Sequence, residues 1–321
     1  MKIEDIRPKT QPERQQQAYL RDVGSYEKML QKFRVRNCPG CHSSNNEFFA
    51  NHLSFSFSKC YACFTVFMNP GPTEEMVEEF YENSSNYEFW ATDIYPSTRE
   101  SRRATIHRDR AVFVLEANQK FKKAMKIKKV LEIGAGTGDT LSVLKELTLD
   151  EPGAYAVEPN LSMQNALRDN GVNVVSSYTE IIGMEFDVIM AFEVLEHFLL
   201  PDKFFAKYGS LVAQEGLIII STPNSHSLEV QLLKNKSTTI DIEHISVLTP
   251  AAIHSLANRH GFKVEMISTP GNFDLELLNT ESVDINIKVS TSRLAKSETQ
   301  ELISKFGFSS HMKIALSKKE V

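Results

Sequence analysis

The stretch that decides the fold spans residues 130–139 and reads VLEIGAGTGD. Its first half is typical of a short buried strand, and its second half places glycines at positions 134, 136 and 138. Glycine lets the backbone turn sharply and lets a ligand approach the chain closely. Leucine and valine follow at helical spacing, so the stretch predicts a strand, a ligand-binding turn and a helix.

Further strands and helices alternate around this stretch. Apolar, β-rich runs occupy residues 129–133, 154–157, 172–175, 186–191, 217–220, 262–267 and 311–317. Alternation of this kind predicts an α/β fold, in which a mostly parallel sheet carries helices on both faces. We therefore expect a Rossmann-like domain with seven strands. The helix before the strand at 262–267 is expected to begin after Thr249, with Pro250 at the first position, and to end at Gly261. A polar helical segment is expected over residues 279–306, ahead of the last strand.

The second strand of this domain ends on an acidic residue. Glu158 lies twenty residues beyond Gly138 and could accept hydrogen bonds from both hydroxyls of a ribose. An NAD ribose would be bound in the same way. The third glycine, however, follows the second after one residue, where the dinucleotide fingerprint has two, and this spacing favours S-adenosylmethionine. A flavodoxin-like turn without an adenosine ligand is the alternative.

Four cysteines stand ahead of the domain in two CxxC pairs. Cys38 and Cys41 form the first pair, Cys60 and Cys63 form the second, and eighteen residues separate them. This spacing is typical of a zinc ribbon, and four thiolates leave no open coordination position, so a Zn²⁺ ion here would be structural. The alternatives are unconnected thiols, a redox pair, or a ribbon that reads RNA. Lys59 is one of few basic residues in the segment, which disfavours RNA.

The remaining segments predict an amphipathic helix over residues 14–33 and another that begins after Thr73. An aromatic-rich loop follows, with Tyr87, Phe89, Trp90 and Tyr95, which would form either a lid or core. A long helix over residues 97–123 carries five arginines, which would either clamp a diphosphate or form a solvated face paired with Glu100. The expected domains are an N-terminal helix (1–35), a zinc ribbon (36–71), a helical cap (72–125) and the cofactor-binding domain (126–321).

Composition narrows the function classes. The 321 residues are 41% hydrophobic and carry a formal net charge of −5, whereas nucleic-acid binders usually carry a basic excess. No apolar run of eighteen residues is present, and the amino terminus is charged and glutamine-rich. We therefore expect a cytoplasmic protein that does not insert into membranes. The oligomeric state is left open.

With these residues in place, the chain from Cys38 onward resembles bacterial methyltransferases that join a zinc ribbon to a class I catalytic domain. Many of these act on sugars or other small metabolites in surface-polysaccharide and natural-product pathways. The matching stretches are the cysteine segment through Tyr95 and residues 130–139, 157–160, 186–198, 221–224 and 243–249.

The resemblance implies roles for particular residues. Those expected at the cofactor or its turn are Glu132, Gly134, Ala135, Gly136, Gly138, Asp139, Glu158, Pro159, Phe192 and Glu193. Phe192 and Glu193 would border the reacting methyl group. The pair Glu243 and His244 would lie at the acceptor, with His244 as candidate base and His197 orienting substrate or fixing its loop. Within this family, the methyltransferases that methylate sugar carbon carry a further carboxyl-terminal domain that this chain lacks. The resemblance therefore favours methylation of oxygen over methylation of carbon.

Methyl transfer from a sulfonium needs an acceptor held in line and a group that removes its proton. A histidine that titrates near neutrality suits that task, although His244 could equally be a loop residue that bonds backbone. Asn224 would hold a substrate hydroxyl or shape its turn. The leading hypothesis is methylation of a small, sugar-linked acceptor. The alternatives are an RNA methyltransferase and a binding protein that keeps the fold without turnover.

Overall fold

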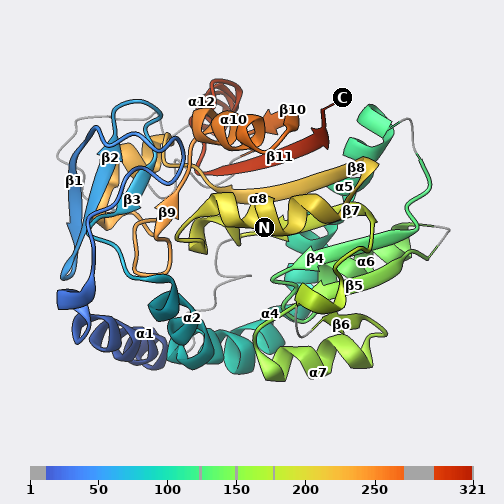
Figure 1. The fold of residues 1–321 in the computed structure, drawn as a ribbon, viewed down its shortest axis with the longest axis horizontal. Coiled ribbons are helices and arrows are strands. Elements are labelled where there is room, and N and C mark those ends of the chain that lie inside the picture. The colour runs from blue at the N-terminus through green and yellow to red at the C-terminus, as the bar shows by residue number, and fades with distance from the viewer. Residues whose placement is uncertain (1–11, 123–124, 149–150, 176–177, 271–292, 320–321) are drawn as a thin grey trace. The chain divides into compact units, whose positions relative to one another are not determined.

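The computed structural model describes residues 12–122, 125–148, 151–175, 178–270 and 293–319. Its main feature is a seven-stranded sheet in the order β10-β11-β8-β7-β4-β5-β6 (Figure 1). The strands are β4 (Lys129–Ile133), β5 (Gly153–Val157), β6 (Asn173–Val175), β7 (Phe186–Phe192), β8 (Val212–Pro223), β10 (Phe262–Ser268) and β11 (His311–Lys318).

Parallel pairing joins β4 to β5, β4 to β7 and β5 to β6, whereas β10 and β11 pair antiparallel. The central strands are buried along most of their length because both faces of the sheet are covered. In β4, for example, every residue after Lys129 is buried. This arrangement confirms the predicted Rossmann-like fold.

The described chain divides into two compact units. The first comprises residues up to Phe33, Pro72–Ala191 and Leu211–Ile218, and the second comprises Arg34–Gly71, Phe192–Ser210 and Ile219–Val321. The segment that holds the cysteines therefore belongs to the same unit as the last third of the chain. The physical reason is strand pairing: β3 (Val66–Met68) pairs with β9 (Ser246–Val247), which completes a four-stranded sheet with β1 (Asn46–His52) and β2 (Phe55–Cys60).

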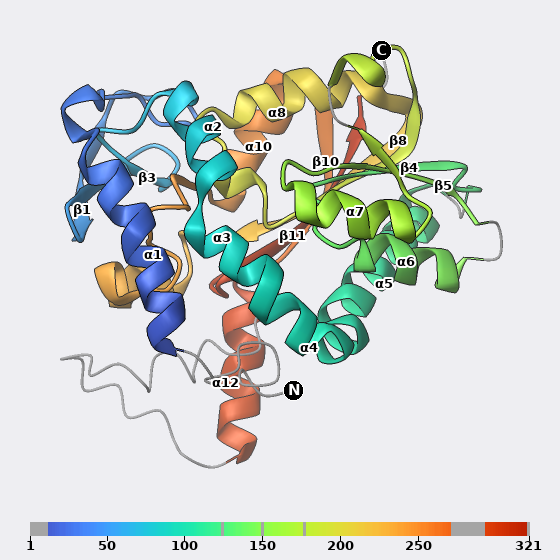
Figure 2. The same cartoon turned by 90° about the horizontal axis from the view of Figure 1, so that it is seen from below.

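Helices make up the rest of the first unit (Figure 2). They are α1 (Pro12–Glu27), α2 (Glu74–Asn83), α3 (Ser85–Phe89), α4 (Tyr95–Arg102), α5 (Arg108–Lys122), α6 (Asp139–Leu147) and α7 (Leu161–Asp169). Thr73 caps α2 as expected, because its hydroxyl accepts from the amide of Met76. Helix α1 ends at Glu27, and a 3-10 turn at Leu30–Lys32 follows it.

The prediction of an aromatic-rich loop is wrong, because the structure has helical segments there. Tyr87 and Phe89 lie on α3, and Trp90 opens a π-helical segment, Trp90–Ile94, that runs into α4. The reason is a distant carboxylate. Asp22 of α1 accepts hydrogen bonds from the amides of Ser85 and Asn86, both at 2.8 Å, and so satisfies donors that the first turn of α3 leaves free.

The second unit contains α8 (Pro201–Tyr208), α9 (Leu228–Leu233), α10 (Pro250–Arg259) and α12 (Arg293–Lys305). Helix α10 begins as expected, since the Thr249 hydroxyl accepts from the amide of Ala252 and Pro250 holds the first position. His260 is its C-cap, and Gly261 follows with φ of +76°. Part of the expected polar helix over 279–306 lies outside the described residues. Among the residues described, no helix has the length and apolarity needed to cross a bilayer.

Candidate active site

The glycine turn lies between β4 and α6. Gly134, Gly136 and Gly138 all have positive φ, at +68°, +56° and +79°. A Cβ on Gly138 would lie 2.6 Å from Cδ2 of Leu167, so this glycine lets α7 pack closely. A Cβ on Gly136 would meet only Sδ of Met163, at 3.9 Å. The chain is therefore open at Gly136, as the close approach of a ligand requires.

Glu158 stands at the end of β5, beside this turn. One carboxylate oxygen accepts from the Gly136 amide at 2.8 Å, and the other accepts from the Asn160 amide at 2.9 Å. The Tyr87 hydroxyl donates to that second oxygen over 3.1 Å. The side chain is 1% exposed, and burial raises its pKa. Sequence reasoning placed Glu158 here but missed Tyr87, which comes from a segment expected to be a loop.

Asp139 begins helix α6 and binds two arginines. Arg99 Nε lies 3.0 Å and Arg103 Nη1 lies 3.2 Å from its Oδ1, and Thr137 Oγ1 donates to Oδ2 over 2.7 Å. Burial alone would raise the pKa of Asp139, but the hydrogen bonds from Thr137 and Arg99 lower it. Asp139 therefore fixes the turn as an anion. Its arginine partners were not anticipated from the sequence.

Three of the five arginines have partners within the first unit, and the diphosphate clamp stays a prediction. Arg99 and Arg103 bind Asp139, and Arg103 also binds Glu146. The guanidinium of Arg102 lies 5.0 Å from the ring centre of Tyr95 and 5.9 Å from that of Trp90. Arg99 and Arg103 connect the cap helices to the glycine turn through Asp139, and the π-helical turn Arg103–His107 packs against α6.

Glu132 lies on β4 under the turn and is 2% exposed. Burial raises the pKa of its carboxyl to about 8, although Arg110 and a hydrogen bond from Thr140 oppose the shift. Ala135 is buried within the turn and Pro159 is exposed. Glu132 is thus placed to support the turn from beneath rather than to contact a ligand directly.

In the second unit, Phe192 ends β7 buried, and Glu193 follows with φ of +58°. The Glu193 amide donates to the Ser221 carbonyl at 2.8 Å, and the Ser221 hydroxyl donates to Glu193 Oε1 at 2.6 Å. His311 Nε2 lies 3.1 Å from Glu193 Oε2. The end of β7 is therefore tied to β8 and β11 through one carboxylate.

Two histidines that are distant in the sequence meet in this unit. The rings of His197 and His244 have their centres 5.1 Å apart, and the two side chains are 22% and 20% exposed. Each uses Nδ1 toward a backbone carbonyl: His197 to Glu243 at 3.0 Å, and His244 to Thr239 at 2.9 Å. Nε2 of His197 also lies 4.0 Å from Oε1 of Glu196. Polar atoms of both rings and of Glu196 lie within 4.8 Å of one another.

Acidic residues surround His244 and set its charge. Burial alone would lower its pKa, but the carboxylates of Asp241, Glu196 and Glu243 raise it to about 9. Glu196 is fully buried, and burial together with the charge of Glu193 raises its pKa to about 7. Burial lowers the pKa of His197. At neutral pH, therefore, His244 is a cation and His197 is neutral.

Asp241 was not anticipated from the sequence. Its Oδ1 accepts from the amides of Glu243 and His244, at 2.8 and 2.9 Å, and so shapes the turn that carries both residues. Asn224 shapes a turn rather than facing a ligand. Its buried amide group donates to the carbonyls of Gly307 and Ser309, both at 2.9 Å.

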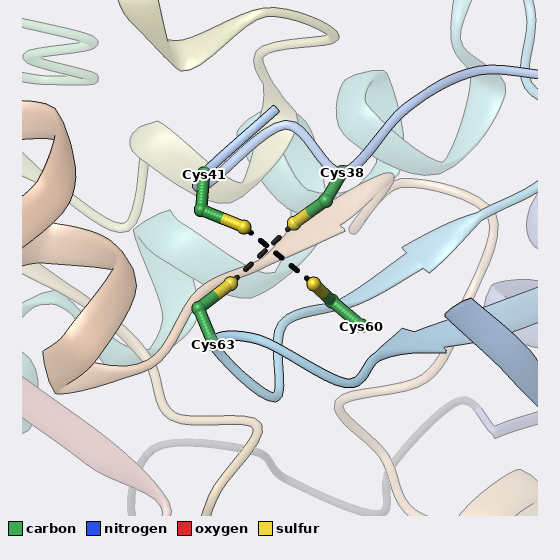
Figure 3. Close-up of side chains that lie close together, drawn as sticks. All are labelled: Cys38, Cys41, Cys60 and Cys63. Atoms are coloured by element: carbon green, nitrogen blue, oxygen red, sulfur yellow. Dashed lines mark hydrogen bonds between the residues drawn. The ribbon is translucent and has the colours of Figure 1, made fainter. Parts of the chain in front are cut away.

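The four cysteines converge as the spacing predicts (Figure 3). Their Sγ atoms lie within 4.8 Å of one another, with 3.5 Å between Cys38 and Cys63 and between Cys41 and Cys60. None of the four is in a disulfide. A hydrogen bond to Cys63 and burial raise the pKa of Cys38, while the same bond lowers the pKa of Cys63. Four sulfurs around one point fit a tetrahedral zinc ion, which would favour the thiolate at every position.

A model of the methyltransferase domain matches residues 98–267, which is more than half of the chain. The chain belongs to the methyltransferase-domain family. It is 32% identical over 103 residues to a ubiquinone biosynthesis O-methyltransferase of Mesorhizobium japonicum. That match takes in 30% of this chain and 41% of the relative's length.

Solved structures share the fold of this methyltransferase. The plantazolicin methyltransferase BpumL, in complex with a monoazolic desmethylPZN analog and SAH, aligns with a TM-score of 0.50 at 14% identity. That alignment covers 76% of this chain and 94% of the other. The complex of BpumL with a pentazolic analog also gives 0.50, with coverage of 76% and 95% at the same identity. At such low identity the similarity is one of fold.

Proposed function

We propose that this methyltransferase methylates a hydroxyl oxygen of a small molecule, a sugar or nucleotide-linked sugar, and that His244 acts on the acceptor proton. The observation that carries the proposal is the cluster of His197, His244 and Glu196. It places the partly exposed imidazole of His244 beside the buried carboxyl group of Glu196. Such a group can bind an oxygen and exchange a proton with it.

S-adenosylmethionine supplies an electrophilic methyl group when bound, so the protein has only to hold it and the acceptor. Glu158 and the open backbone at Gly136 are suited to its ribose and amino-acid portions. We assign Glu132, Gly134, Ala135, Gly138, Asp139 and Pro159 to the turn that shapes this site, and Phe192 and Glu193 to the border with the acceptor. The four cysteines are proposed to hold a structural zinc ion.

The proton balance follows from the charge of His244. Its cationic form can donate a hydrogen bond from Nε2 to the acceptor oxygen and so orient it. Its neutral form can take the hydroxyl proton at Nε2 while the oxygen forms its bond to methyl and the sulfonium becomes a neutral thioether. Glu243 contributes its carbonyl to His197 and negative charge to His244. His197, which is neutral, is proposed to orient the neighbouring ring.

Two observations favour a small acceptor that is methylated at oxygen. The ubiquinone relative is named as an O-methyltransferase, although the match covers under half of it. The chain is also acidic overall. In the segment 36–71, which holds the four cysteines, the Lys59 amine lies 3.8 Å from Glu47 and 3.3 Å from the Gln231 side chain. A basic surface of the kind that grips RNA would need such amines free for phosphates.

Isotope-labelled methyl transfer tests the proposal. The purified protein receives labelled S-adenosylmethionine and separate pools of nucleotide sugars, free sugars, phenols, peptides and RNA. We expect label in a sugar-containing pool, on oxygen, and none with Glu158→Gln, which serves as the matched control. Label in phenols alone would keep oxygen methylation and replace the sugar. Label in RNA or peptide would contradict the proposal.

A further inference from the structure

Arg36 is the first residue of the cysteine module, the segment 36–71 that holds the four cysteines. Its side chain reaches both loops that carry His197 and His244. Its Nη1 donates to the Leu199 carbonyl at 2.9 Å, two residues beyond His197. Its Nη2 donates to the Ile245 carbonyl at 2.7 Å, one residue beyond His244, and to the Ser246 hydroxyl at 2.9 Å. One planar guanidinium thus connects two loops. Its contacts there, Leu199 and Ser246, follow Arg36 by 163 and 210 residues in the sequence.

The aromatic and backbone surroundings hold this guanidinium in place. Its Cζ lies 5.4 Å from the ring centre of Phe67, a fully buried residue of β3. The Arg36 amide donates to the side chain of Asn69 at 3.1 Å. A Cβ on Gly71 would come within 3.1 Å of Arg36 Cδ, so a larger residue at position 71 would crowd the Arg36 side chain. Arginine is suited to the position because its fork of donors has a fixed geometry.

The cysteine module also clamps the segment after His244 at both ends. The Met68 amide donates to the same Ile245 carbonyl at 3.1 Å, and Phe67 pairs with Ser246 in the sheet. Farther on, the Thr249 hydroxyl donates to the carbonyl of Cys63, one of the four cysteines, at 2.6 Å. The backbone from Ile245 to Thr249 therefore takes its position from residues 36–68.

We propose that Arg36 is a positioning residue for the His197 and His244 pair, through which the cysteine module sets the geometry of the acceptor site. The inference rests on the proposed function of that pair. It gives the four-cysteine cluster a role beyond local stability. Loss of the guanidinium would remove hydrogen bonds that join the two loops, and a displacement of about 1 Å can cost on the order of a hundredfold in rate.

The test compares Arg36→Met with Arg259→Met. Arg259 is the matched control, because it binds the Gly40 carbonyl and Asp202 and so anchors the same module without contacting either histidine loop. Both variants are assayed for zinc content, S-adenosylmethionine affinity, kcat and KM, and for the histidine pKa values by NMR of labelled imidazoles. For Arg36→Met we expect kcat to fall about ten- to a hundredfold, cofactor affinity to stay within about twofold, and the pKa of His244 to move toward its ordinary value. Arg259→Met should lower the melting temperature alone.

Two further variants keep the result interpretable. Ser246→Ala removes one contact without emptying the site, and we expect a smaller change in the same direction if Arg36→Met does not fold. Arg36→Lys keeps the charge but cannot reach all three acceptors, so it should restore little. An unchanged His244 pKa and unchanged kcat in Arg36→Met would overturn the inference. If the wild-type protein methylates no hydroxyl acceptor, the proposed function fails, and the NMR comparison still decides the role of Arg36.

Discussion

Single residues of this methyltransferase owe their chemistry to neighbours that are distant in the sequence. His197 and His244 are both half-enclosed imidazoles, yet the pKa of one is lowered and that of the other is raised to about 9. Three carboxylates around His244 account for the difference. The sequence identified both histidines and Glu243 as candidates, but the charge of His244 depends on Asp241 and Glu196, whose positions follow from folded loops.

The charge of His244 predicts a pH dependence for methyl transfer. A base with a pKa of about 9 is active only in its neutral form, so kcat/KM should rise about tenfold per pH unit below 9 and then level. His244→Gln should lower kcat/KM by about a hundredfold or more at pH 9 and flatten the profile, with little change in cofactor affinity. The measurement is initial rate at pH 6–10.

His42→Gln is the control for that experiment, since His42 belongs to the same unit but lies 2.8 Å from Asp202 and touches neither loop. Its profile should follow the wild type. A variant at position 244 that keeps the wild-type slope would remove His244 from proton transfer.

The raised pKa of Glu132 predicts that the free energy of unfolding depends on pH. Its pKa is about 8 in the folded chain against 4.5 in the unfolded chain, so its protonated form is favoured by folding. The contribution is fully present below pH 4.5 and is lost as pH rises through about 8. Glu132→Gln, which mimics the protonated acid, should therefore gain stability relative to wild type between pH 5 and pH 8.

Fluorescence of Trp90, the single tryptophan of the chain, can follow this unfolding because it lies in the same unit as Glu132. The informative quantity is the difference in melting temperature between the two proteins at each pH. A difference that stays constant from pH 5 to pH 8 would show that Glu132 keeps its ordinary pKa.

At the scale of elements, regular segments were predictable and long-range connections were not. Strand β4, the glycine turn and the caps Thr73 and Thr249 follow from local patterns of apolarity, glycine and hydroxyl side chains. Helix α3 was missed because Asp22, more than sixty residues away, satisfies its first amides. Strand β9 was missed because two residues carry too little pattern, and its partner β3 lies far upstream.

The hydrogen bond from Tyr87 of helix α3 to Glu158 should affect cofactor affinity. Glu158 already accepts from two backbone amides and from the Tyr87 hydroxyl, which leaves few lone pairs for two ribose hydroxyls. The amides are fixed by the turn, so Tyr87 is the donor that must move. Tyr87→Phe should bind S-adenosylmethionine about three- to tenfold more tightly, since one such hydrogen bond contributes about 1 kcal/mol.

Isothermal titration calorimetry measures the change, with Glu158→Gln as the opposing variant. That substitution keeps the shape but removes the charge, and it should weaken binding at least about tenfold because charged acceptors are the stronger ones. If Tyr87→Phe binds more weakly than wild type, the tyrosine contributes to the cofactor site instead of competing for Glu158.

At the scale of the whole molecule, the glycine turn and Glu158 belong to one compact unit and the cysteine cluster to the other. Removing the metal should therefore disturb one unit and spare the other. With Cys41→Ser, or after chelation, we expect faster hydrogen exchange in β1, β2, β3 and β9, unchanged exchange in β4 and β5, and loss of methyl transfer. Four-thiolate sites contribute folding energy directly to such modules.

Cofactor affinity measured on the same samples separates the two units. It should stay within about twofold of the zinc-loaded protein, because Gly136 and Glu158 bind through contacts confined to the first unit. A parallel loss of affinity and metal would show that the units depend on one another for folding.

The pairing of β3 with β9 has a consequence during synthesis. All four cysteines leave the ribosome early and can capture metal there, but Arg36 meets the Ile245 carbonyl only after a further 209 residues have been made. At about 5–20 residues per second, this interval lasts roughly 10–40 s. Until then, β3 lacks its partner strand β9, and the four-stranded sheet around the cysteines is incomplete. The enzyme becomes competent only when its last third emerges.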